Sequence, residues 1–216
     1  MAGSSGFSLV EVLVALGISG VVAWAILSLQ INQSKSAAVQ AEVVAMQQGL
    51  RGSMTLLTTE LKKAGYDPTN TAGAGIVDAT STLLYYTSDN DPSGNSNGAL
   101  TEAGEHAAFC FTANTLRFVE GNSTIANPCD TVNPVVMADL QMVEFRYLRN
   151  DGTVAATPAE IRMVQVTLLG RTRNPDPNYK NTSSYTFPSG VGWGPFNDGF
   201  RRQMLTTTIA LWNMGS

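Results

Sequence analysis

The feature that most constrains this chain is an apolar segment near its N-terminus. Residues 9 to 29 are apolar apart from Gly17, Gly20 and three polar positions, Glu11, Ser19 and Ser28. About 20 such residues can cross the hydrocarbon core of a bilayer as a helix. A carboxylate inside such a segment costs a few kcal/mol, so we expect Glu11 to have a function.

Three interpretations of this segment compete on the residues alone. It can be a signal anchor that tolerates Glu11 near its end. It can be a secretory signal peptide cleaved at the small-x-small sequence of residues 23–25, although it lacks a basic n-region. The third interpretation uses the whole pattern around residue 6, where a short polar leader ends in Gly6 and is followed by Phe7 and an aliphatic run.

The sequence GFSLVEVLVAL, residues 6–16, resembles the class III signal of type IV prepilins. The resemblance implies that a membrane prepilin peptidase cuts after Gly6 and methylates the new amine of Phe7. It also implies that Glu11, the fifth residue of the mature chain, lies near the N-terminal amine of a neighbouring subunit. Such a pair is far stronger in a low-dielectric filament core than in water and would set the axial register.

The leader departs from the family pattern in one respect. Prepilin leaders normally carry Lys or Arg, but residues 1–6 are MAGSSG, and the first basic residue is Lys35. The positive-inside rule therefore does not supply the expected orientation of the segment.

An amphipathic pattern follows the apolar segment without an intervening proline. Large apolar residues recur at steps of three and four, as on one face of a helix, at Val39, Val43, Met46, Leu50, Met54, Leu57 and Leu61. Gly65 and Pro68 are stop signals. We therefore expect one helix from about Phe7 to Ala64 with an apolar first half and an amphipathic second half.

Beyond Pro68 the pattern is that of strands. Short segments rich in branched and aromatic residues, several of them alternating, occupy residues 82–87, 107–112, 115–120, 141–148, 161–169 and 204–212. We expect hairpin turns at residues 112–115 and 149–153, and a long surface loop over about 174–202. The chain thus belongs to the α+β class.

Two further stretches resemble PilW-type minor pilins: MTLLTTELKKAGYDP with the following AGAGI, and the C-terminal FRRQMLTTTIALWNMG. The resemblance implies a type IV pilin fold, in which a long N-terminal helix packs on an antiparallel sheet. The implied domains are a leader (1–6), a membrane or filament-core helix (7–31), an amphipathic helix (32–65) and a β-rich head (66–216).

One loop has ligand spacing for calcium. Asp89, Asp91, Ser93, Asn95 and Asn97 stand at positions one, three, five, seven and nine of an EF-hand-like pattern. The twelfth position is Leu100 and no helix follows, so Glu102 or Glu105 would have to supply the last carboxylate. The alternative is a solvated loop. Calcium is the one cofactor that the sequence suggests.

The remaining chemistry-bearing residues are few. Cys110 and Cys129 are expected to form a disulfide if the domain lies outside the cytoplasm. His106 is the only histidine, is expected on the surface, and has no nucleophile motif beside it. The formal net charge of −4 provides no basic surface for nucleic acid. We therefore expect a protein that is not an enzyme.

The family resemblance implies a structural subunit of a type IV pilus, with other pilins, the prepilin peptidase and the inner-membrane assembly machinery as partners. The chain would sit in the inner membrane with its head in the periplasm and then move into a pilus at the cell surface. Two alternatives stay open: a minor, tip-type pseudopilin of type II secretion, and a membrane-anchored binding module that does not assemble.

Overall fold

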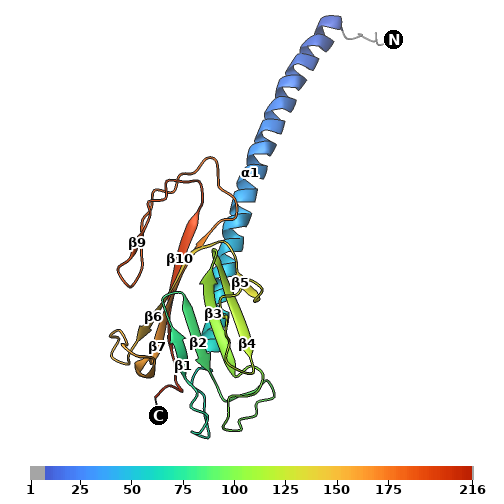
Figure 1. The fold of residues 1–216 in the computed structure, drawn as a ribbon. Coiled ribbons are helices and arrows are strands. Elements are labelled where there is room, and N and C mark those ends of the chain that lie inside the picture. The colour runs from blue at the N-terminus through green and yellow to red at the C-terminus, as the bar shows by residue number, and fades with distance from the viewer. Residues whose placement is uncertain (1–7, 216) are drawn as a thin grey trace. The chain divides into compact units, whose positions relative to one another are not determined.

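The computed structural model describes residues 8–215, and the chain divides into two compact units, residues 1–42 and 43–216. A single helix, α1 (Leu9–Leu61), runs through both (Figure 1). After Leu61 the chain turns through Gly65, which adopts a φ of 75° and donates its N–H to the carbonyl of Thr87. Glycine adopts this left-handed conformation without strain, which explains why the helix stops here.

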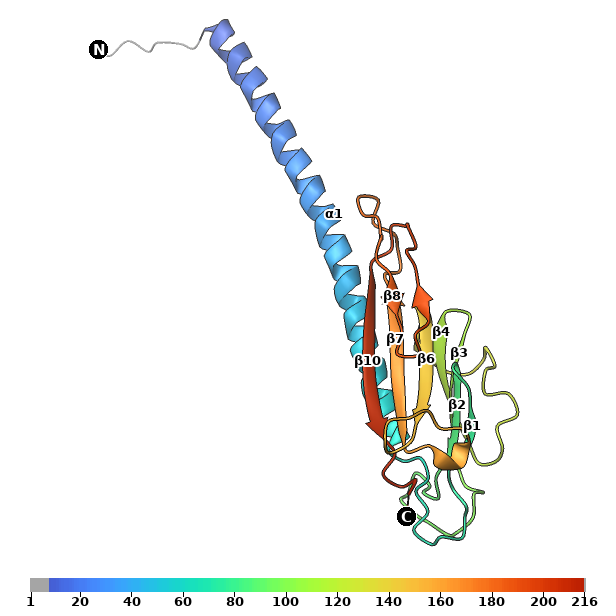
Figure 2. The same ribbon diagram turned by 90° about the vertical axis from the view of Figure 1, so that its left-hand side faces the viewer.

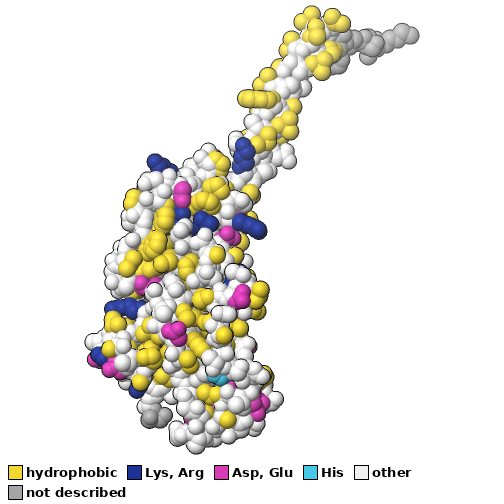
Figure 3. Space-filling view, in the orientation of Figure 1, with side chains coloured by type: hydrophobic (Ala, Val, Ile, Leu, Met, Phe, Trp, Pro, Cys, Tyr) yellow, Lys and Arg dark blue, Asp and Glu magenta, His cyan; other side chains and the backbone are white. Residues whose placement is uncertain are grey.

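The described part of the first unit is helix alone. Its large apolar side chains from Leu9 to Ile31 are exposed, and Figure 3 shows hydrophobic side chains along this part of α1. By length and composition, α1 contains a stretch that can cross a membrane. A helix that is apolar all round needs a bilayer or other helices around it.

The second unit contains two larger antiparallel sheets (Figure 2). The first has the order β1-β2-β3-β4-β5 and comprises β1 (Ile76–Ala79), β2 (Leu83–Thr87), β3 (His106–Thr112), β4 (Thr115–Gly121) and β5 (Val135–Met137). The second has the order β10-β7-β6 and comprises β6 (Leu140–Leu148), β7 (Met163–Arg171) and β10 (Arg202–Ala210). A short 3-10 helix, η1 (Pro158–Glu160), precedes β7.

The six predicted strands are all present, and the predicted fold is confirmed: a long N-terminal helix packs on an antiparallel β domain. The hairpin predicted at residues 112–115 joins β3 to β4 through Ala113 and Asn114, both of which have positive φ. Such a two-residue turn matches the twist of the strands it connects. The short strands β1 and β5 were not predicted.

The core lies between the second half of α1 and the inner faces of both sheets. The helix contributes the predicted stripe from Met46 onward, with Met46, Leu50, Met54, Leu57 and Leu61 all buried. Leu84 and Phe109 meet it from the first sheet, and Val166 and Leu168 from the second. Burial of this stripe is what fixes the second half of α1 on the head.

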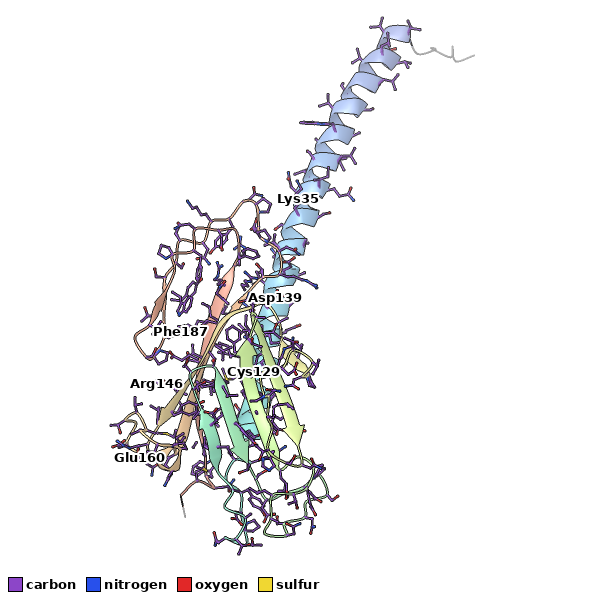
Figure 4. All side chains as sticks on the ribbon, viewed as in Figure 1. Lys35, Cys129, Asp139, Arg146, Glu160 and Phe187 are labelled. Carbon is purple, nitrogen blue, oxygen red and sulfur yellow. A yellow bond between two sulfur atoms is a disulfide. The ribbon has the colours of Figure 1, made fainter. Side chains whose placement is uncertain are left out.

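Residues 172–201 form more than the surface loop that the sequence predicts. They contain the small hairpin of β8 (Tyr185–Thr186) and β9 (Gly192–Trp193), and Phe187 is buried (Figure 4). Ser189 donates a hydrogen bond to Glu144 on β6, which ties the segment to the second sheet. The spacing of glycines and prolines indicates turns but does not reveal these contacts.

Candidate functional site

The predicted processing residues, Gly6 and Phe7, lie outside the described residues. The third predicted residue, Glu11, lies in the first turn of α1. The backbone N–H of Ser8 donates to Glu11 Oε2 at 2.9 Å, and the N–H of Glu11 donates to Ser8 Oγ at 3.2 Å. This reciprocal pair is a capping box, which satisfies two backbone donors at the start of a helix.

The role of Ser8 was missed from the sequence, although its signal was readable. A serine followed three positions later by a glutamate, before an apolar run, is the pattern of a capping box. Glu11 therefore has a local role besides the one that the prepilin resemblance implies. Its carboxylate also lies at the positive end of the helix dipole, where a negative charge is favourable.

Glu11 is exposed, and only one of its two carboxylate oxygens accepts a hydrogen bond from residues 8–215. Oε2 accepts from Ser8, whereas no hydrogen bond to Oε1 occurs among residues 8–215. One oxygen thus fixes the start of the helix while the other can accept a proton donor from outside the chain. The arrangement is compatible with a charged amine of a neighbouring subunit next to Glu11.

The loop predicted to bind calcium connects β2 to β3, and its aspartates bind its own backbone. Asp89 is fully buried and accepts the N–H groups of Asn97 at 3.1 Å and Gly98 at 3.0 Å. Asp91 accepts the N–H groups of Ser93 at 2.9 Å and Asn95 at 2.8 Å. These carboxylates therefore shape the loop by binding its own backbone.

One carboxylate pair in this loop is electrostatically unfavourable. Asn97 donates its side-chain amide to Glu102 Oε1, while Glu102 Oε2 is buried without a hydrogen-bond partner among residues 8–215. Burial and the neighbouring Asp91 carboxylate raise the pKa of Glu102, whereas backbone donors, that of Asn95 first, lower the pKa of Asp91. No group of three or more His, Cys, Asp or Glu side chains within the described residues is placed to hold a metal. Calcium stays a prediction.

The two cysteines form a disulfide. Cys110 on β3 is bonded to Cys129 in the segment between β4 and β5, with their Cα atoms 5.2 Å apart (Figure 4 labels Cys129). A hydrogen bond also connects this segment to the first sheet, because the N–H of Ile125 donates to the hydroxyl of Tyr85 on β2 at 3.1 Å. The disulfide and this bond fix the segment over the outer face of the first sheet.

The expectation that His106 lies on the surface is wrong. It is buried at the start of β3, where Nδ1 lies 2.7 Å from the Tyr85 hydroxyl and Nε2 lies 3.2 Å from the carbonyl of Leu100. A backbone carbonyl can only accept, so Nε2–H donates to Leu100, while Nδ1 shares a hydrogen bond with the Tyr85 hydroxyl, which also accepts the N–H of Ile125. His106 thus links β2 to the loop that carries Leu100 and has a structural role.

Comparison with known proteins gives matches at both ends of the chain. Residues 1–27 match the prokaryotic N-terminal methylation motif, and residues 134–213 match the family of type IV pilus-assembly protein W. No curated protein matches the chain at a significant level.

Among solved structures, the type IV-like pilin TTHA1219 from Thermus thermophilus has a similar fold. The two superpose with a TM-score of 0.55 at 16% sequence identity, over 78% of this chain and 98% of the Thermus protein. At that identity the similarity bears on the fold alone. The methylation motif and the PilW match together support a PilW-type, type IV pilin-like family and a role as a pilus subunit, and the Thermus structure supports the pilin fold.

Proposed function

We propose that the chain is a minor pilin whose role is structural and not enzymatic. In this proposal, the prepilin peptidase removes residues 1–6, cutting after Gly6, and methylates the amine of Phe7. The mature chain then lies in the inner membrane with its head in the periplasm. The assembly machinery transfers it from there into a filament of other pilins.

The observation that carries the proposal is the exposed apolar surface of α1 beside the Glu11 carboxylate, of which only Oε2 accepts a hydrogen bond within residues 8–215. The large apolar side chains from Leu9 to Ile31 have no cover within the described residues, so the helix requires a bilayer before assembly and other helices after it. Glu11 is the acidic group of this surface. In a bundle of such helices it would attract the positive N-terminus of a neighbour and so select one axial register.

Two other roles use the same anchor. A minor pseudopilin of a type II secretion machine would be processed and assembled in the same way with different partners. A membrane-anchored binding module would keep the helix as a tether, and neither the cut after Gly6 nor the charge of Glu11 would matter to it.

The test is fractionation of cells that express the chain with and without the prepilin peptidase. The proposal predicts the chain in sheared surface filaments only when the peptidase is present, and only in the inner membrane when it is absent. A chain confined to the inner membrane in both strains would contradict assembly and favour the anchored module. Loss of the chain from filaments in a strain lacking only the secretion machine would identify the pseudopilin.

A further inference from the structure

An open cavity of about 430 Å³ lies at the end of the head where α1 stops. Three segments line it: the turn after the helix (65–74), the region of η1 with Arg162, and the C-terminal turn (212–215). Two aromatic residues belong to the lining: Trp212, which is 79% exposed, and Tyr66, which is 40% exposed. Folding of the head does not account for the exposure of the Trp212 indole ring.

The turn that carries Trp212 is held firmly. The preceding Leu211 is buried, and its N–H donates to the carbonyl of Arg162 at 2.8 Å. The side-chain amide of the following Asn213 donates to the carbonyl of Lys62 at 2.8 Å, and the N–H of Met214 donates to the carbonyl of Leu211. The indole is therefore presented to solvent by a fixed backbone, and covering its face with a ligand would remove apolar surface from water.

The polar lining offers both acceptors and donors. Asp67 is the acceptor in this lining. Its Oδ1 accepts from Thr69 and Thr71, its Oδ2 accepts the N–H of Gly73 at 2.8 Å, and the N–H of Ala74 also lies at the carboxylate. Arg162 donates from Nη1 to the carbonyls of Ala159 and Ile161, while no bond from Nε or Nη2 occurs within residues 8–215. Asn70 adds a side-chain amide to the same lining.

These groups select a class of ligand by its charge and hydrogen bonding. An anion would be repelled by Asp67 and a cation by Arg162. A hydroxyl group, by contrast, can donate to a carboxylate and accept from a guanidinium or an amide at once. A polyhydroxylated ring with one apolar face would satisfy these polar groups and also cover an aromatic side chain.

We propose that this cavity is a binding site for a neutral saccharide, which lies against the ring of Trp212 and hydrogen-bonds to Asp67, Arg162 and Asn70. The site lies wholly within the head and does not depend on the apolar surface of α1. Binding can therefore be measured whether or not the chain assembles into filaments.

The experiment uses the full chain in detergent on an array of neutral oligosaccharides built from glucose, galactose and N-acetylglucosamine, with sialylated and sulfated glycans beside them. The proposal predicts saturable binding to at least one neutral glycan. Trp212→Ala should weaken that binding by about tenfold or more, since a stacked aromatic contact has roughly that effect. Trp212→Phe, which keeps a ring, should weaken it less.

Two further variants keep the test decisive. Val132→Ala shortens a side chain that is 84% exposed and lies outside the cavity, and it should bind as the wild type does. Asn70→Gly removes the side-chain amide at a position whose φ of 52° glycine adopts without strain, and it should weaken binding even if Trp212→Ala proves unstable. The proposal is overturned by an absence of neutral-glycan binding, by binding to acidic glycans only, or by unchanged affinity in Trp212→Ala or, should that variant not fold, in Asn70→Gly.

Discussion

Ser8 and Glu11 form two reciprocal hydrogen bonds at the start of α1. The N–H of Ser8 donates to Glu11 Oε2 at 2.9 Å, and the N–H of Glu11 donates to Ser8 Oγ at 3.2 Å. The carboxylate thus has a structural task in the single chain as well as the intersubunit task that we propose. The two tasks differ in their requirements, because capping needs only an acceptor oxygen whereas register selection needs a charge.

The first prediction separates these tasks. Glu11→Gln keeps an oxygen that can accept the N–H of Ser8, so the helix should still begin at the same place, but it loses the charge, and incorporation into sheared filaments should fall strongly. Ser8→Ala removes the cap at a cost of about 1 kcal/mol and keeps the charge, so it should still assemble. Immunoblots of filament and membrane fractions provide the measurement. Equal incorporation of Glu11→Gln and wild type would contradict a role for the charge.

The second prediction concerns the disulfide. It closes a loop with a sequence separation of 19, and loop-closure entropy assigns it a stabilisation of about 3 kcal/mol. Urea unfolding of the full chain in detergent should show a loss of this size in the double variant Cys110→Ser with Cys129→Ser. The bond from Ile125 to Tyr85 should keep the segment in place in the folded variant. Reductant should destabilise the wild type and leave the double variant unchanged; an equal response of both would refute the prediction.

The fold was largely predictable because its main signals are local. The apolar stripe of α1 and the alternation within the long strands are periodic patterns, and both led to the observed elements. The short strands β1 and β5 were missed because segments of four and three residues are too short to show a periodic pattern. His106 was misplaced because its burial depends on contacts with Tyr85 and with the loop that carries Leu100, which no local pattern reveals.

The candidate sites were predictable to different degrees. The motif around Gly6 and Phe7 is a local pattern, and the cap formed by Ser8 could also have been read from spacing. The cavity beside Trp212 could not, because it joins segments around residues 66, 162 and 212. No pattern within one segment reveals such a juxtaposition.

The third prediction addresses the loop with calcium-like spacing. Burial and the nearby Asp91 raise the pKa of Glu102 in the folded state. The folded state therefore loses stability as the pH rises from the ordinary pKa of a glutamate through this raised pKa. Glu102→Gln should therefore raise the melting temperature at pH 7 in the presence of a chelator. If calcium binds between these carboxylates, it should raise the melting temperature of the wild type and not that of the variant. A wild-type protein that shows no shift with millimolar calcium would exclude the site.

The fourth prediction concerns acid stability. Arg202 donates to both carboxylate oxygens of Asp198, at 2.6 and 2.7 Å, and these bonds lower the pKa of Asp198. A lowered folded-state pKa contributes stability that is present above about pH 4, the unfolded value, and is lost as the pH falls through the folded value. The unfolding free energy, measured with urea from about pH 6 down to about pH 3, should show this decline. In Asp198→Asn the decline should be smaller. Asp139→Asn, at a residue in no ion pair within the described chain, is the control and should decline as the wild type does.

The fifth prediction tests the packing of α1 on the second sheet. A Cβ added at Gly170 on β7 would lie 3.1 Å from three carbons of Leu50, which is 1% exposed and has little room to move. Gly170→Ala should cost about 1–3 kcal/mol in chemical unfolding, as overpacked cores do. Gly192→Ala meets no atom within 4 Å and should change the unfolding free energy little. Similar stability of the two variants would show that the helix does not pack this closely.

The most direct test of the account is the intact mass and N-terminal analysis of the chain taken from sheared surface filaments. The account predicts a chain that begins at N-methylated Phe7, with residues 1–6 removed. A filament-borne chain that still begins at Met1 or Ala2 would contradict processing, and with it the proposed route from membrane to pilus.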